Sequence, residues 1–129
     1  MVELMQDMDW QEEPMTLDEY EADAMQTAIY PDALLYPVMG LMGEAGEIAE
    51  KVKKYYRDNA MSVSCEDAVE EIPAEVRMSI ARELGDVLWY VTAIASDIGY
   101  DLEEVAMLNL EKLQDRQSRD VLTGSGDYR

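Results

Sequence analysis

Two pairs of carboxylates, each with the two acids three residues apart, stand in a chain that contains no histidine. Glu44 and Glu47 belong to the stretch GLMGEAGEIAEKVKK, and Glu83 and Asp86 belong to ELGDVLWY. Residues three apart lie on one face of an α-helix, so each pair can present both carboxylates in one direction. Oxygen ligands select hard divalent cations, so the pattern predicts a Mg²⁺ site, with Mn²⁺ as a substitute.

The helices that carry these acids must also bring them together. Helical periodicity places Glu83 at the edge of an apolar stripe, with Asp86 further round the same side, and Glu44 at the edge of a second stripe, with Glu47 further round. If the two helices pack antiparallel along these stripes, the four carboxylates meet across the groove. Their mutual repulsion then calls for cations.

Three glycines interrupt the first acidic stretch, at Gly40, Gly43 and Gly46. An interior helix glycine costs about 1 kcal/mol relative to alanine, so three of them need a compensating role. We expect that the missing Cβ atoms let another helix or a ligand approach the acidic turn closely.

Caps and helix breakers predict four helices, over residues 17–29, 38–57, 73–99 and 102–119. Thr16 with Glu19, and Asp101 with Glu104, have the spacing of a capping box, and Gly99 suits the residue just past a helix end. Strand patterns are absent from the sequence. The predicted fold class is therefore all-α, a four-helix bundle.

Composition limits the domain organisation and the partners. Residues 1–15 read as an N-terminal extension, 16–120 as one helical domain with a polar connector at 58–73, and 121–129 as a C-terminal tail.

A formal net charge of −19 argues against DNA, RNA and anionic membranes as partners. The sequence shows no basic-then-apolar leader and no apolar run of about 18 residues, so we expect a cytoplasmic protein that does not enter membranes. The modest core favours a homo-oligomer.

Cationic and amide side chains could complete a phosphate site. Asn109, Lys112 and Arg116 follow one side of the last predicted helix, and we expect them to face the cavity of the carboxylates and hold phosphate oxygens. Lys51 and Lys54 are further candidates for ligand contact, although cations near a helix C-terminus also complement its dipole.

The remaining conspicuous side chains have simpler interpretations. Trp89 is predicted to face away from Glu83, in the core or an interface, and Trp10 is predicted to serve packing alone. The single cysteine, Cys65, permits no disulfide within the chain and is expected to be inert.

Taken together, GEAGEIAEKVKK and ELGDVLWY resemble the MazG-like nucleoside triphosphate pyrophosphohydrolases, an all-α family with an ExxE…ExxD signature. The resemblance covers about residues 16–129, and LYPVMGLMGEAGEIAEKVKKYYRD and NLEKLQDRQSR look like the short phage-encoded members. The 35 residues between Glu47 and Glu83 exceed the usual family spacing, so the connector is expected to reshape the substrate mouth.

The resemblance implies roles for individual residues. Glu44, Glu47, Glu83 and Asp86 would be the Mg²⁺ ligands and catalytic carboxylates, with Glu47 the first candidate to orient or deprotonate the attacking water. Tyr90 would sit near phosphate. Asn109 and Lys112 match the family's polar positions on its last core helix.

The implied reaction cleaves a nucleoside triphosphate between the α- and β-phosphates, giving a nucleoside monophosphate and pyrophosphate. The resemblance also implies a homodimer or a dimer of dimers with sites near subunit contacts, working in the host cytoplasm if a phage encodes it. Similarity to the phage-type members, among them the MazZ group that acts on guanine nucleotides, makes dGTP and GTP the first expectation and a broader dNTP range the second. Gln26, Thr27 and Tyr30 are the candidate base contacts.

One alternative of a different class stays open at this point. A non-catalytic acidic helical oligomer could carry the same carboxylates as a structural metal site or as solvated surface, because Glu and Lys at helical spacing usually face solvent.

Overall fold

A computed structural model of the chain describes residues 14–59, 72–119 and 121, and all of its regular structure within these ranges is helical. The elements are α2 (Leu17–Ala24), the 3₁₀ turn η1 (Met25–Thr27), α3 (Leu35–Asn59), α4 (Ala74–Asp97) and α5 (Leu102–Ser118). The all-α prediction with four main helices is confirmed. The predicted extension and tail, most of the connector, Trp10 and Cys65 lie outside the described residues, so the domain bounds stay a prediction.

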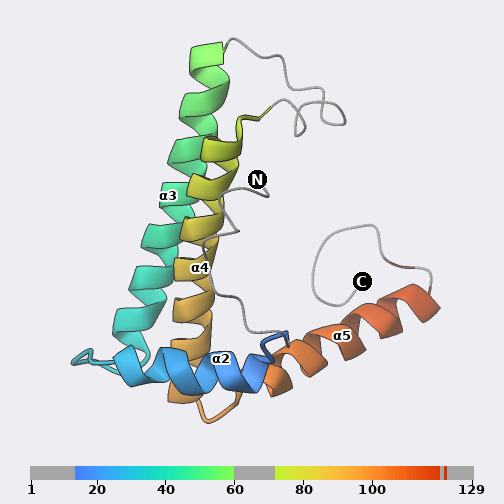
Figure 1. Cartoon of the computed structure of the whole chain (residues 1–129). Coiled ribbons are helices and arrows are strands. Elements are labelled where there is room, and N and C mark those ends of the chain that lie inside the picture. The colour runs from blue at the N-terminus through green and yellow to red at the C-terminus, as the bar shows by residue number, and fades with distance from the viewer. Residues whose placement is uncertain (1–13, 60–71, 120, 122–129) are drawn as a thin grey trace.

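Helices α3 and α4 form a long antiparallel pair, α2 crosses one end of that pair, and α5 leads away from the end of α4 (Figure 1). Contacts of α5 are made with α2 and α4. Within one chain, α5 therefore points away from the α3–α4 pair and does not run back along it.

The buried core of this arrangement is small and lies where α4 meets its neighbours. Thr92, Ala93 and Ala95 near the end of α4 are buried, as are Pro37 on α3 and Leu102 on α5. Large apolar side chains elsewhere are exposed, among them Met42 at 66% and Leu110 at 55%. Apolar surface of this extent commonly marks a contact with another molecule.

The first helix begins as predicted and ends earlier. The amide of Glu19 donates to Thr16 Oγ1 at 3.2 Å and the amide of Thr16 donates to Glu19 Oε2 at 2.8 Å, which completes the capping box. The prediction that the helix reaches Ile29 is wrong. The carbonyl of Ala24 accepts hydrogen bonds from the Trp89 indole at 3.2 Å and the Thr27 hydroxyl at 2.7 Å, so the chain tightens into η1 there.

Helix α3 begins at Leu35, three residues before the predicted start, because Pro37 sits in a first turn that does not need its missing N–H. It ends at Asn59, within the Asp58-Asn59 pair at which the sequence predicts its end. Leu34, just before α3, has a φ of 62°, which is unusual for a residue with a side chain.

The junction of α4 and α5 follows the predicted end signals. Gly99 has a φ of 82°, and the amide of Tyr100 donates to the carbonyl of Ala95 at 3.0 Å, the pattern of a Schellman motif. Asp101 and Glu104 then form the capping box of α5. None of the helices in the described ranges combines the length and hydropathy that a bilayer-spanning segment needs.

Candidate active site

The packing of α3 against α4 brings three of the four predicted carboxylates together. Glu44 on α3 and Glu83 and Asp86 on α4 each offer an oxygen atom, and these oxygens lie within 4.8 Å of one another. Glu47, one helical turn beyond Glu44, is exposed and lies outside this group. We call Glu44, Glu83 and Asp86 the acidic group.

Charges in the acidic group act on one another. Partial burial raises the pKa of Glu44, and the negative charges of Asp86, Glu83 and Glu47 raise it further. Lys51 Nζ lies 3.1 Å from Glu83 Oε1 and offsets one of these charges. Two unit charges about 4 Å apart repel by about 4 kcal/mol at an effective dielectric constant of about 20, so a divalent cation would relieve strong repulsion here.

The donor set fits such a cation. Three carboxylate oxygens from two rigid helices provide hard, negatively charged ligands that suit Mg²⁺ or Mn²⁺. Mg²⁺ commonly combines a few protein carboxylates with water and substrate phosphates, so three protein ligands are enough.

A cavity of about 420 Å³ opens beside the acidic group, within the size range of small-molecule sites. Thr27, Glu44, Asp86, Trp89 and Tyr90 line it. Trp89 was predicted to lie on the side away from Glu83, in the core or an interface. Glu83 is not among the residues that line this cavity, but Trp89 lines it together with Glu44 and Asp86. The Trp89 indole N–H donates to Thr27 Oγ1 at 2.8 Å, and this bond links the ring on α4 to η1 at the cavity.

Four aromatic rings form a continuous cluster next to this cavity. Tyr30 stacks on Tyr36 with centroids 5.5 Å apart and meets Trp89 edge-on at 6.1 Å. Trp89 meets Tyr90 edge-on at 5.0 Å, and Tyr36 lies 6.5 Å from Tyr90. Burial is the main cause that raises the pKa of Tyr90, and the neighbouring Tyr36 raises it further. Sequence reasoning missed Tyr36, whose only signal was a second tyrosine in YPDALLYP.

The structure shows a role for one of the three glycines, Gly40. An added Cβ at Gly40 would overlap Cε1 of Tyr90, so the missing side chain admits the Tyr90 ring against α3. The close-approach prediction is therefore confirmed at Gly40. At Gly43 and Gly46 an added Cβ meets nothing within 4 Å in the described part of the chain.

The other predicted residues of the N-terminal half divide between the site and its surroundings. Lys51 reaches the acidic group, while Lys54 pairs with Glu50 at 3.1 Å and is exposed. Gln26 is exposed and its amide donates to the carbonyl of Ala22 at 3.2 Å. Thr27 lines the cavity, and Tyr30 joins the ring cluster behind it.

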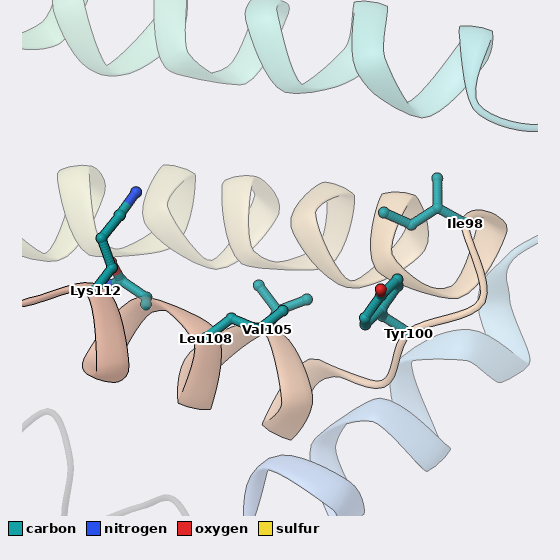
Figure 2. Close-up of a pocket in the computed structure, with 6 residues that line it drawn as sticks. Ile98, Tyr100, Val105, Leu108 and Lys112 are labelled. Carbon is teal, nitrogen blue, oxygen red and sulfur yellow. The ribbon is translucent and has the colours of Figure 1, made fainter. Parts of the chain in front are cut away.

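The predicted α5 residues lie elsewhere in the single chain. Asn109 and Lys112 line a second cavity of about 430 Å³ between α5 and the end of α4, which Figure 2 shows with its apolar lining. Arg116 is buried on α5, with 7% of its surface exposed. The expectation that these residues share the carboxylate cavity is not met within one chain, because α5 leaves the α3–α4 pair at its end.

Comparison with known families decides the class of protein. The model of the MazG nucleotide pyrophosphohydrolase domain matches residues 37–120, more than half of the chain. The chain belongs to the MazG family. This membership makes it a nucleotide pyrophosphohydrolase, and MazG enzymes generally use divalent metals, which agrees with the acidic group.

Two relatives of this MazG protein are a phage protein and a bacterial one. The Gene 37 protein of Mycobacterium phage L5 is 46% identical over 123 residues, which cover 89% of this chain and 100% of that protein. The uncharacterized protein YvdC of Bacillus subtilis (strain 168) is 36% identical over 78 residues, covering 59% of this chain and 68% of that protein. No solved structure gives a significant match.

The MazG match contains the acidic group, Lys51 and Tyr90, and it also contains Asn109 and Lys112 on α5. Thr27 and Tyr30 precede the matched region. One wall of the cavity is therefore supplied by a segment outside the part of the chain that the family model recognises.

Proposed function

We propose that this MazG protein is a Mg²⁺-dependent pyrophosphohydrolase that converts a nucleoside triphosphate to a nucleoside monophosphate and pyrophosphate. The observation that carries the proposal is the acidic group, whose oxygens lie within 4.8 Å of one another beside a cavity of about 420 Å³. A triphosphate is itself highly anionic, so it can approach these carboxylates only with cations between them.

Glu44, Glu83 and Asp86 hold the metal in this proposal. A bound divalent cation supplies neutralisation of the triphosphate charge and activation of water for attack at phosphorus. Glu47, exposed one turn beyond Glu44, accepts the proton of the attacking water as the bond between the α- and β-phosphates breaks. Pyrophosphate then leaves with the bridging oxygen.

Lys51 and Tyr90 assist from the edges of the acidic group. The Lys51 ammonium that now pairs with Glu83 can turn to a phosphate oxygen once a metal neutralises the carboxylate. Tyr90 lines the cavity beside Glu44 and Asp86, and in this proposal it lies near the phosphates. Lys54 is a weaker contributor, because Glu50 holds it.

The nucleobase occupies the part of the cavity bounded by Thr27, Trp89 and Tyr90 in this proposal. Aromatic faces accept any base, so the rings favour binding without choosing among bases. The Thr27 hydroxyl and the nearby Gln26 amide are the polar groups that could read the base, with Tyr30 behind them. We propose dGTP and GTP as the preferred substrates, on the similarity to phage-encoded members, and a broader dNTP range as the alternative.

A homodimer or homotetramer would complete the site. Met39 and Met42 on α3 and Leu110 and Leu113 on α5 are 64%, 66%, 55% and 41% exposed, so both helices offer apolar faces for a second copy. We propose that α5 of that copy brings Asn109 and Lys112 to the acidic group, where a lysine would complement the carboxylates and the triphosphate. Arg116 would support α5 in this position. Nucleic-acid polymers and membranes are not expected partners of so acidic a chain.

The deciding experiment incubates the purified protein with each of the eight common NTPs and dNTPs and separates the products. With Mg²⁺, monophosphate and pyrophosphate should form without diphosphate, fastest from dGTP or GTP, and a chelator should stop the reaction. Equal turnover of all dNTPs would establish the broad-range alternative. Absence of any turnover would favour the non-catalytic acidic oligomer.

A further inference from the structure

We propose that Asp97 is a positioning residue for nucleotide binding. Its hydrogen bonds to the segment between η1 and α3 hold the cluster of four aromatic rings in place behind the base cavity. The proposal rests on the proposed function of the acidic group and its cavity. Asp97 is the last residue of α4 and is half-buried.

Both carboxylate oxygens of Asp97 accept hydrogen bonds from this one segment. The Tyr30 hydroxyl donates to Oδ1 at 2.9 Å, and the backbone amide of Leu34 donates to Oδ2 at 2.6 Å. Hydrogen bonds to an ionised acceptor are stronger than neutral ones, and two of them from points four residues apart fix the segment at both ends.

The backbone at the second of these points is strained. Leu34 has a φ of 62°, a left-handed conformation that a side chain with a Cβ atom rarely adopts. Such a conformation persists only where its surroundings hold it, and strained residues of this kind gather at functional sites. The amide that Asp97 binds belongs to this strained residue, so the carboxylate supplies the restraint.

The fastened segment carries a ring that backs the cavity. Tyr30 meets Trp89 edge-on at 6.1 Å and stacks on Tyr36 at 5.5 Å, while Trp89 and Tyr90 line the cavity itself. Asp97 is not among the cavity-lining residues. Its influence on a bound base therefore passes through Tyr30 to Trp89.

This arrangement separates binding of the base from the chemistry at phosphorus. The acidic group lies on α3 and α4 and makes no use of Asp97. Loosening the segment should raise KM for a nucleotide, because the stacking wall loses its fixed position, and should leave kcat nearly unchanged.

The test compares two substrates in matched variants. Asp97→Ala removes both acceptors, Asp97→Asn replaces one acceptor oxygen with a donor, and Asp32→Ala changes an exposed aspartate of the same segment as the control. The substrates are the best nucleotide from the panel and an abasic deoxyribose 5′-triphosphate, which has phosphates and sugar but no base. For the nucleotide we expect KM to rise about tenfold in Asp97→Ala and about threefold in Asp97→Asn, with kcat within about twofold. KM for the abasic substrate should not change.

Binding is also measured without turnover. In a Trp10→Phe background the fluorescence reports Trp89 alone, and titration with the nucleotide in Ca²⁺, together with circular dichroism, separates weaker binding from unfolding. Asp97→Asn keeps the proposal testable if Asp97→Ala does not fold.

The outcomes are distinct. An equal rise in KM for both substrates, or a loss of kcat at constant KM, would overturn the positioning role. If the parent protein binds nucleotide and both Asp97 variants match it, this proposal fails while the proposed function stands. If the parent neither binds nor hydrolyses any nucleotide, the proposed function fails and takes this proposal with it.

Discussion

Two cavities in the described part of the chain are alike in size and different in chemistry. One, of about 420 Å³, is lined by two members of the acidic group and by Thr27, Trp89 and Tyr90. The other, of about 430 Å³, lies against α5 and is lined mainly by apolar side chains with one amide and one lysine. Volume does not tell a reaction site from a packing surface. Convergent charges and raised pKa values, as at Glu44 and Tyr90, point to the first cavity.

The cavities also differ in how they are built. The first cavity lies where η1, α3 and α4 of one chain meet, so packed helices hold its acidic side chains. The second lies between α5 and the end of α4, where α5 leaves the rest of the chain (Figures 1 and 2). The open apolar surface of the second cavity, beside the exposed side of α5, suits contact with a second copy, while the first cavity suits a ligand.

The largest expected effect comes from removing carboxylates of the acidic group at the first cavity. Glu83→Gln and Asp86→Asn should each lower kcat/KM by about 100-fold or more, because each removes a charged ligand of the proposed metal. Glu111→Gln, an acid of α5, is the matched control and should leave activity within about twofold. Pyrophosphate release gives the rates, and circular dichroism checks that the helices persist. Similar losses in all three variants would contradict the assignment of the site.

The next prediction tests whether α5 of one copy contributes side chains to the active site of a neighbouring copy. Lys112→Met should raise KM about tenfold if its ammonium meets the triphosphate. Mixing Lys112→Met protein with Glu83→Gln protein should restore activity above the sum of the two, since a mixed oligomer contains sites with both intact groups. Full activity of Lys112→Met alone would instead leave the α5 cavity outside the reaction.

A third prediction contrasts two glycines of α3. Gly40→Ala should destabilise the protein by about 1–3 kcal/mol, because the new Cβ would displace the Tyr90 ring from its place in the cluster. Gly43→Ala should stabilise by up to about 1 kcal/mol, since its Cβ meets nothing in the described chain and alanine favours the helix. Thermal melts measure both. A destabilising Gly43→Ala would show that another copy packs closely there.

The smallest effect concerns pH. The pKa of Glu44 in the folded protein lies above its ordinary value of 4.5, so the folded state binds this proton more tightly than the unfolded state. Its stabilising contribution is present below that ordinary value and is lost as pH rises through the raised one. In chelator, Glu44 should therefore make the melting temperature rise as pH falls from above its raised pKa towards 4.5. Glu44→Gln should weaken this dependence, and saturating Mg²⁺ should do the same. An unchanged slope in Glu44→Gln would assign the effect to other acids.

Local chemistry made much of the fold predictable. Capping boxes at Thr16 and Asp101 and the left-handed residue at Gly99 follow from side chains within a few residues, and the structure has all three. The close approach at Gly40 was predictable as well, although its partner, Tyr90, was not.

Errors arose where a distant residue decided the outcome. At the end of α2, the carbonyl of Ala24 accepts a hydrogen bond from Trp89, 65 residues away, as well as one from the nearby Thr27 hydroxyl. The position of Trp89 at the cavity was not predicted, since a helical wheel shows which side a ring occupies but not what packs there. No sequence pattern indicated a role for Asp97, because the two groups that donate hydrogen bonds to it belong to a segment more than 60 residues earlier.

By itself, the sequence determined the helices and the edge on which each acid lies, because a period of 3.6 residues and local caps act over a few positions. It also predicted a preference for a hard cation, since carboxylates without histidine leave little other choice. Only the tertiary structure decided that Glu44 meets Glu83 and Asp86 while Glu47 stays apart, and that α5 turns away from them. Those outcomes depend on the packing of surfaces that are remote in the chain, which no local pattern encodes.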